Sequence, residues 1–304
     1  MCIKERNASD STCKKLLRDK GCFADLCNYA FFQGRQVIQP EELISRENDL
    51  STLIGKVDKP TEIKRYRDVV RKASIHGDYV IIGVEHQSTF DEKMIFRILN
   101  YDATIYINQV ESKQEIYPVG SFVFYTGDKE WKSPETLKET LKNIPPEMEP
   151  YINDWRLPVV ELKTMDARKL TNQRLKEVVE ISQSMFAGNY DDLRNNRKIE
   201  IENFMMAATF TRTKIKREDL PEGDEINMCE AMDRLFQRFE DQGIEKGKRE
   251  EKQNTLKDLL KVKLGTLSRP LEKQLTNTSL EKLNELTLNI FNVRNEDDVL
   301  RIIN

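Results

Sequence analysis

Residues 65–87, RYRDVVRKASIHGDYVIIGVEHQ, decide the fold of this chain. Two runs rich in β-branched residues flank a turn signal at residues 76–78, which is the pattern of a β-hairpin. The second run, residues 79–84, is apolar throughout, and such runs form the buried central strands of sheets. This strand nevertheless ends on three polar residues, Glu85, His86 and Gln87.

The polar end of the strand has two faces. Alternate side chains of a strand share a face, so Glu85 and Gln87 point to one side of the sheet and His86 points to the other. A two-residue turn at 76–77 places Asp68 of the partner strand opposite Glu85, whereas a turn at 77–78 places Asp68 opposite Gln87. Both of these even-length turns predict Asp68, Glu85 and Gln87 on one face, whereas a three-residue loop would not.

These three residues form a candidate metal site. Two carboxylates that face each other at the end of a buried strand repel unless a cation or a proton lies between them. Mg²⁺ suits Asp68 and Glu85, because it binds one or two protein carboxylates and keeps positions for water and phosphate. Gln87 cannot be a base, since a carboxamide does not titrate near neutrality, but it can orient water or phosphate. The alternative is that Asp68 and Glu85 are simply polar residues where two strands reach solvent.

The segments around the hairpin predict a mixed α/β arrangement. Before it, apolar residues at helical spacing predict a helix from about Phe23 to Gly34. After it, Ser88 and Asp91 have the spacing of a capping box and predict a long amphipathic helix that follows the hairpin directly. Two further strands are expected at residues 119–125 and 156–163.

The second half of the chain is predicted to be helical. Highly charged helical sequence runs from about residue 166 to 239. Residues 240–255 have alternating charges, almost no apolar side chains and two glycines. Because each glycine inside a helix costs about 1 kcal/mol relative to alanine, we expect a linker, a weak helix or a self-associating rod there. Residues 256–304 predict a small bundle of two or three helices.

The composition limits the class of function. The 304 residues, 38% of them hydrophobic, suffice for a large domain and a smaller unit. A formal net charge of −3 excludes a generic polyanion binder, so contact with DNA requires a local basic patch. No window approaches the roughly 20 apolar residues of a membrane span, and no signal peptide is evident, so we expect a cytoplasmic protein with no membrane partner. Five cysteines without CxxC spacing and only two histidines argue against a zinc site and favour reduced thiols.

Three stretches resemble the Rpn family of recombination-promoting nucleases, which are also described as putative transposases of the PD-(D/E)XK nuclease type. They are VEHQSTFDEKMIFRILNYDATIY (84–106), FADLCNYAFFQGRQVIQPEEL (23–43) and FVFYTGDKEW (122–131). The similarity runs from about Phe23 to Leu162 and continues more weakly to Phe239. It implies a restriction-endonuclease-like core, which is a mixed sheet entered by a hairpin and flanked by helices.

The resemblance also implies roles for individual residues. Asp68 becomes the hairpin aspartate of the nuclease motif and Glu85 its second metal ligand. Gln87 stands where many relatives of the wider superfamily carry lysine, although glutamine is usual in the Rpn group. Asp25, in the first helix, matches an acidic position that assists the metal in some members; an exposed aspartate on a helix surface is the alternative. His86 is expected to pack or hydrogen-bond beneath the helix after the hairpin.

Arg97 and Tyr101 are further candidates for the site. They lie four residues apart on the helix after the hairpin and can both face the carboxylates, where an arginine suits a phosphate group bidentately. An ordinary polar helix face is the alternative. We therefore regard Arg97 and Tyr101 as candidate substrate-binding residues.

The expected organisation is a nuclease-like domain at 1–239, with its core at about 12–165 and a helical extension at about 166–239. A charged linker or helix at 240–255 follows, through which chains can self-associate. The helical unit at 256–304 is similar to one that follows many such nucleases.

The implied function is that of a Mg²⁺-dependent endonuclease, with Mn²⁺ as a substitute, that cuts DNA with low sequence specificity and promotes recombination or mobilisation. A second hypothesis is a non-catalytic module that keeps the nuclease fold and binds nucleic acid or protein; the acidic balance and the absence of the motif lysine favour it. A transposase that also joins strands is a third, which requires recognition of specific DNA ends.

Overall fold

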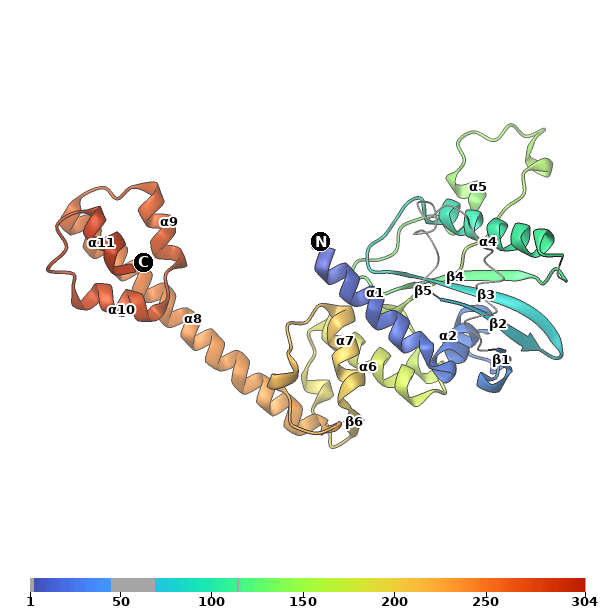
Figure 1. Ribbon diagram of the computed structural model, residues 1–304, viewed down its shortest axis with the longest axis horizontal. Helices are drawn as coiled ribbons and strands as arrows, with labels where there is room; N and C mark the ends of the chain where they lie inside the picture. The colour runs from blue at the N-terminus through green and yellow to red at the C-terminus, as the bar shows by residue number, and fades with distance from the viewer. Residues whose placement is uncertain (1–2, 45–68, 114, 304) are drawn as a thin grey trace. The chain divides into compact units, whose positions relative to one another are not determined.

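The computed structural model describes residues 3–44, 69–113 and 115–303. In this part of the chain, five strands form one sheet in the order β1-β2-β3-β4-β5 (Figure 1). β1, β2 and β3 are antiparallel neighbours, whereas β3, β4 and β5 run parallel. A mixed sheet with flanking helices and a helical C-terminal region confirms the predicted α/β class. The strands are β1 (Leu43–Ile44), β2 (Val69–Ile75), β3 (Asp78–Gln87), β4 (Val119–Tyr125) and β5 (Val159–Glu161).

The predicted hairpin is formed by β2 and β3. Val69 pairs with Val84 and Ile75 with Asp78, so the turn consists of His76 and Gly77. Both turn residues have positive φ, 54° and 95°, as a two-residue turn that matches the twist of its strands requires. Of the two registers considered, the structure has the one with the turn at 76–77. Asp68 lies outside the described residues.

β3 is the central strand because it has neighbours on both edges and helices on both faces. It is buried from Ile81 to Gln87, and its parallel neighbour β4 is buried from Ser121 to Tyr125. Burial on both faces explains the continuous apolar run before Glu85. β4 has the predicted bounds, while β5 is shorter than the predicted strand at 156–163.

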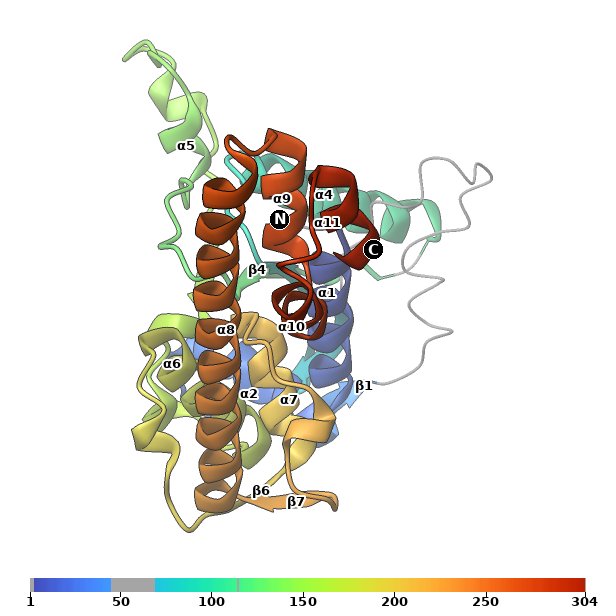
Figure 2. The same ribbon diagram turned by 90° about the vertical axis from the view of Figure 1, so that its left-hand side faces the viewer.

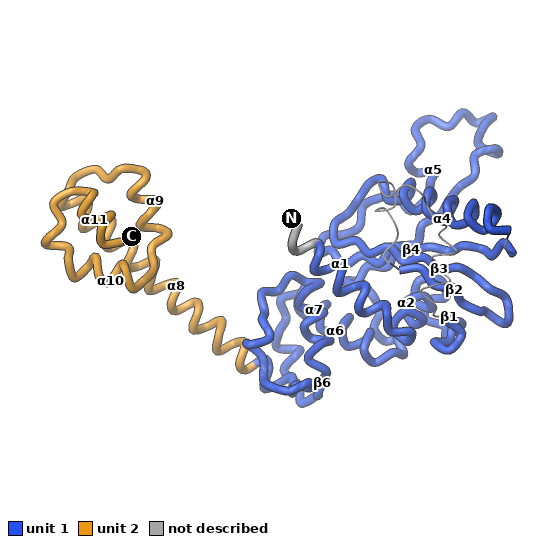
Figure 3. Tube along the Cα trace, viewed as in Figure 1, with its two compact units in different colours: residues 1–232 blue, residues 233–304 orange. Residues whose placement is uncertain are grey.

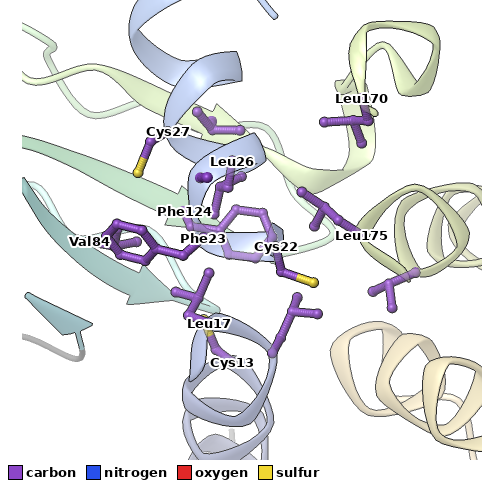
Figure 4. Close-up of a cluster of buried hydrophobic side chains, with 14 of the residues drawn as sticks. Cys13, Leu17, Cys22, Phe23, Leu26, Cys27, Val84, Phe124, Leu170 and Leu175 are labelled. Carbon is purple, nitrogen blue, oxygen red and sulfur yellow. The ribbon is translucent and has the colours of Figure 1, made fainter. Parts of the chain in front are cut away.

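One face of the sheet forms the main hydrophobic core. Val84 of β3 and Phe124 of β4 lie against Phe23 and Leu26 (Figure 4). These two residues come from α2, and α1 and α6 add further buried side chains, including Leu17 and Leu175. The helices on this side are α1 (Ile3–Arg18), α2 (Lys20–Phe32), α6 (Gln173–Ala187) and α7 (Ile201–Thr211).

The opposite face is covered by α4 (Met94–Glu111), which connects β3 to β4 (Figure 1). Met94 and Ile98 of α4 pack on Val123 and Tyr125 of β4. Because the hairpin strand and this helix adjoin in sequence, residues early in α4 lie over the carboxyl end of β3. This arrangement positions the candidate site.

The N-terminal region differs from the prediction of one helix from about Phe23. It contains two helices, and the break falls at Asp19, whose carboxylate accepts a hydrogen bond from the Cys22 backbone N–H at 2.8 Å and caps α2. Gly21 lies inside α2, where an added Cβ would come within 2.5 Å of the Asn172 side chain. The glycine therefore permits close packing against the start of α6.

The predicted capping box at Ser88 is wrong. α4 begins at Met94, and its N-cap residue, Lys93, makes no side-chain capping bond. The Asp91 carboxylate accepts from the Lys93 N–H at 3.0 Å and so caps the turn before the helix instead. Ser88 continues from β3, and its carbonyl accepts a hydrogen bond from Arg212 at 2.9 Å.

Short elements complete the first part of the chain. The strands β6 (Lys198–Glu200) and β7 (Glu225–Asn227) form a small antiparallel sheet that the sequence did not predict. α5 (Leu137–Thr140) is a single turn. The 3₁₀ helices are η1 (Pro40–Glu42), η3 (Glu149–Tyr151), η4 (Leu162–Thr164), η5 (Ala167–Lys169), η6 (Asp191–Leu193) and η7 (Arg217–Asp219).

The chain divides into two compact units, residues 1–232 and 233–304 (Figure 3). α8 (Met228–Leu264) is one continuous helix, so residues 240–255 are helical (Figure 2). In the second unit, leucines of α8 form a small core with those of the following helices. These helices are α9 (Arg269–Asn277), α10 (Leu280–Leu288) and α11 (Glu296–Ile303). None of the helices among the described residues has the length and apolar character of a membrane span.

Candidate active site

Glu85 and Gln87 lie together at the carboxyl end of β3, on the face that α4 covers. Each is 4% exposed. Gln87 Nε2 donates a hydrogen bond to Glu85 Oε1 at 3.2 Å, so the two side chains share a face, as strand alternation predicts. A carboxylate at this depth costs free energy unless it is paired and hydrogen-bonded, so its partners determine what it can do.

Arg97 of α4 is the cationic partner of Glu85. Its Nη2 donates to Glu85 Oε1 at 2.7 Å, and its Nη1 donates to Asp91 Oδ2 at 3.0 Å. Tyr101, one turn further along α4, hydrogen-bonds with Arg97. The structure therefore brings Arg97 to the carboxylate and Tyr101 to Arg97. It adds Asp91, whose side chain the sequence analysis had used only as a helix cap.

The neighbouring side chains change the pKa of Arg97. Burial acts to lower it, but the charge of Glu85 and the hydrogen bonds with Tyr101 and Asp91 outweigh burial and raise the pKa above its ordinary value. The guanidinium is thus a permanent positive charge. It neutralises Glu85 in the buried part of the site.

His86 lies on the other face of β3 and takes no part in this cluster. Its Nδ1 is 2.9 Å from Asp10 Oδ1, and its Nε2 is 2.8 Å from Thr126 Oγ1. Its ring also contacts Phe124 and Phe210. The expected structural role is consistent with these contacts, but its position is not the predicted one. His86 lies beneath α1 and α7 and not beneath the helix after the hairpin, because alternation turns it away from α4.

Asp25 is buried in α2, with an exposed fraction of 2%, and is not an exposed helix-surface residue. Its Oδ2 accepts from the backbone N–H groups of Thr171 and Asn172, each at 2.9 Å. Its Oδ1 accepts from Gln36 Nε2 and from the Thr171 hydroxyl, each at 3.0 Å. These bonds satisfy donors at the start of α6. The Asp25 carboxylate thus connects α2 to the start of α6.

Arg212 is a residue near the site that the sequence analysis missed. It follows α7 in the left-handed conformation, with φ of 59°, and its Nη2 reaches the Ser88 carbonyl at the end of β3. Burial is the first cause of a raised pKa at Tyr125, and the charge of Glu161 adds to it, while Arg212 acts in the opposite direction. Arg212 is therefore a second cation at the carboxyl ends of β3 and β4. Because Arg212 lies 124 residues after Ser88, no local sequence pattern could have predicted their contact.

A second buried carboxylate, Asp102 of α4, lies on the same face of the sheet. It is 1% exposed and accepts a hydrogen bond from the Ser121 hydroxyl of β4 at 2.7 Å. Asp102 and Ser121 tie the middle of α4 to β4. The amphipathic pattern of α4 contained this signal, because Asp102 falls on the buried and mostly apolar side of the helix.

The side chains at the site fit a hard divalent cation in their donor chemistry. Glu85 offers carboxylate oxygens and Gln87 a carboxamide oxygen on one face, and Mg²⁺ prefers such ligands. Within residues 3–44, 69–113 and 115–303, however, no group of three or more His, Cys, Asp or Glu side chains is arranged to hold a metal. Of the two predicted carboxylate ligands, Asp68 and Glu85, the described residues include only Glu85.

Comparison with known protein families gives a match to the middle of the chain. Residues 61–210 match the model of a family described as "Putative transposase, YhgA-like". The matched range includes β2, β3, α4, β4 and β5, together with α6 and nearly all of α7. No curated protein and no solved structure matches this chain. The resemblance to a transposase family is therefore confirmed over this range.

Proposed function

We propose that this chain, whose residues 61–210 match the model of the YhgA-like putative transposases, is a divalent-cation-dependent DNA endonuclease. The placement of Glu85 carries the proposal. A carboxylate that is 4% exposed ends the central strand of the sheet and is held by Arg97 and Gln87. Ligands of open α/β sheets bind at the carboxyl ends of parallel strands, where these groups lie. Cutting DNA with low sequence specificity would promote recombination or mobilisation, which is a transposase-like role.

The proposed roles follow from the chemistry of each side chain. Asp68 and Glu85 would hold Mg²⁺ or Mn²⁺, and the bound cation would polarise the phosphodiester and lower the pKa of a water ligand. Gln87 fixes the Glu85 carboxylate and orients water or a phosphate oxygen by hydrogen bonding. Arg97, held by Tyr101 and Asp91, donates charge-assisted hydrogen bonds to phosphate. Water would add to phosphorus and lose a proton to solvent, and the P–O bond to the leaving sugar oxygen would break, with that oxygen taking up a proton from solvent.

The first prediction tests the two carboxylates. Asp68→Asn and Glu85→Gln should each lower Mg²⁺-dependent nicking of supercoiled plasmid by at least about a hundredfold, because a catalytic metal stabilises transition-state charge by several kcal/mol. The matched control is Glu92→Gln, which removes an exposed carboxylate close to Glu85 in sequence and should keep full activity. Circular dichroism and thermal melting would establish that each variant is folded. Undiminished cleavage by the purified double variant would refute the proposal.

The non-catalytic alternative also has an observation in its favour. Arg97 already neutralises Glu85, so the fold does not require a cation at this place. Calorimetric titration of the wild-type chain with Mg²⁺ or Mn²⁺ separates the two functions. Heat of binding that disappears in Glu85→Gln supports the endonuclease, whereas the absence of any binding supports a DNA- or protein-binding module.

A further inference from the structure

Arg97 forms ion pairs with two carboxylates, Glu85 and Asp91, which differ in solvent exposure. Glu85 has a side chain 5% exposed, whereas Asp91 is 33% exposed and Arg97 itself is 35% exposed. The two contacts use different nitrogens, Nη2 for Glu85 and Nη1 for Asp91. Either bond can therefore break while the other persists.

The bond to Glu85 competes with a cation for the same oxygen. Arg97 Nη2 lies 2.7 Å from Glu85 Oε1, which also accepts from Gln87. A Mg²⁺ ion binds a carboxylate oxygen at about 2.0–2.1 Å. A guanidinium that stayed in place would lie against a doubly charged cation beside the buried Glu85 carboxylate, where screening by water is weak and like charges repel. Occupancy by the cation therefore favours release of Nη2.

Asp91 and Tyr101 keep the released guanidinium at the site. The Asp91 carboxylate still holds Nη1, so the side chain pivots rather than swings into solvent. The freed N–H groups then need an anionic acceptor, and a phosphate oxygen is the group whose geometry matches a guanidinium best.

From these contacts we propose that Arg97 is an exchangeable counter-ion: it pairs with Glu85 in the cation-free protein and transfers to a DNA phosphate when a divalent cation takes Glu85. This inference rests on the proposed function and deepens it. It makes cation binding and DNA binding reciprocal, because each partner removes a competitor of the other. Arg97 thus contacts Glu85 when the cation is absent and DNA when the cation is bound.

The first test measures cation affinity without DNA. The full chain, stripped of metal, is titrated calorimetrically with Mn²⁺ as wild type, Arg97→Gln and Arg97→Lys. Loss of a charge-assisted hydrogen bond to Glu85 should tighten Mn²⁺ binding about tenfold in Arg97→Gln, with Arg97→Lys intermediate. Lys93→Gln is the control, since Lys93 is an exposed cation at the start of the same helix and should change the affinity less than about twofold.

Equal or weaker Mn²⁺ binding by a folded Arg97→Gln, with the wild type binding normally, overturns the exchange and leaves the endonuclease proposal standing. Failure of the wild type to bind Mn²⁺ overturns both. Thermal melting of each variant shows whether it is folded, and Arg97→Lys, which keeps the charge, provides the result if Arg97→Gln unfolds.

A second measurement detects the coupling itself. Fluorescence anisotropy of a labelled short duplex, with and without Ca²⁺, gives the factor by which the cation strengthens DNA binding. The exchange predicts that this factor falls about fivefold in Arg97→Gln and stays unchanged in Lys93→Gln. A purely structural Arg97 would leave it unaltered, and that outcome would overturn the proposal.

Discussion

Glu85 and His86 are adjacent in sequence, yet they serve different layers of the molecule. Glu85 faces α4 and interacts with Arg97, while His86 faces α1 and interacts with Asp10. Both are almost fully buried, and both have hydrogen-bonding partners, as buried polar groups require. The period of two along a strand therefore turns these two adjacent side chains toward different layers of the molecule.

His86 allows this separation to be tested. His86→Ala should lower the free energy of unfolding by about 2–4 kcal/mol, because it leaves a cavity beside Phe124 and Phe210 and removes buried hydrogen bonds. The Mn²⁺ affinity of the folded variant should stay within about twofold of the wild type, since the ring faces away from Glu85. Urea unfolding and calorimetry measure the two quantities. A large loss of cation affinity without loss of stability would assign His86 to the site.

Only some of the individual residues of the site could be predicted from the sequence. Alternation along β3 placed Glu85 with Gln87, and helical spacing placed Tyr101 next to Arg97, because both rules act over a few residues. The partners of Asp25 and the position of Arg212 depend on contacts between distant segments, such as Asp25 with Thr171. No local pattern encodes such contacts.

The elements that were predicted best are a strand with a clear apolar pattern and a hairpin whose turn residues fix its register. β4 has the predicted bounds, and the β2–β3 register follows from a two-residue turn at 76–77. The start of α4 was misjudged because a capping-box spacing arises easily by chance, and at Ser88 the backbone continues from the strand. β6 and β7 were missed because strands of three residues are too short to show alternation.

Contacts between helices give an electrostatic prediction. Glu202 of α7 pairs with Lys15 of α1 and Arg174 of α6. The hydrogen bond from Lys15 is the largest cause of a pKa below the ordinary 4.5 for Glu202, and Arg174 adds to it. A carboxyl whose pKa is lower in the folded than in the unfolded chain stabilises the fold above its unfolded pKa. That contribution is lost as the pH falls through the folded pKa.

Glu202→Gln should therefore destabilise the protein at neutral pH and matter less in acid. The free energy of unfolding should fall by less than about 1 kcal/mol at pH 7, because the pair is partly exposed. The difference from wild type should shrink as the pH falls below 4.5. Urea unfolding at both pH values measures it, with the exposed Glu222→Gln as the control. A loss of equal size at both pH values would contradict the assignment.

The two units of the chain have separate cores, and one helix passes through the boundary between them. The core of the second unit consists of leucines of α8, α9 and α10 with Val293, Val299 and Ile303. Composition predicted a weak or absent helix at residues 240–255, whereas α8 continues through them. Propensity is a weak prior for such a segment, because the apolar ends of α8 are fixed in cores and a helix propagates cooperatively from them.

The stability of α8 between the cores can be measured directly. Residues 239–251 are all exposed, and a Cβ added at Gly243 or Gly247 would meet nothing within 4 Å. Replacing both glycines by alanine should stabilise the helix by about 2 kcal/mol, since each interior glycine costs about 1 kcal/mol. Trypsin acts on Lys246, Lys248 and Arg249 only when the helix opens, so cleavage there should slow by roughly tenfold or more.

Gln242→Ala is the matched control for this experiment, because it also introduces alanine into the exposed turn but changes helix propensity little. Its cleavage rate should stay close to that of the wild type. After cleavage of the wild type, calorimetry should show one unfolding transition for each fragment, since each retains its own buried core. If the double alanine variant were cleaved as fast as the wild type, opening of α8 would be governed by its junctions with the two cores and not by the glycines. The same variants therefore determine whether local propensity or the anchored ends keep this segment helical.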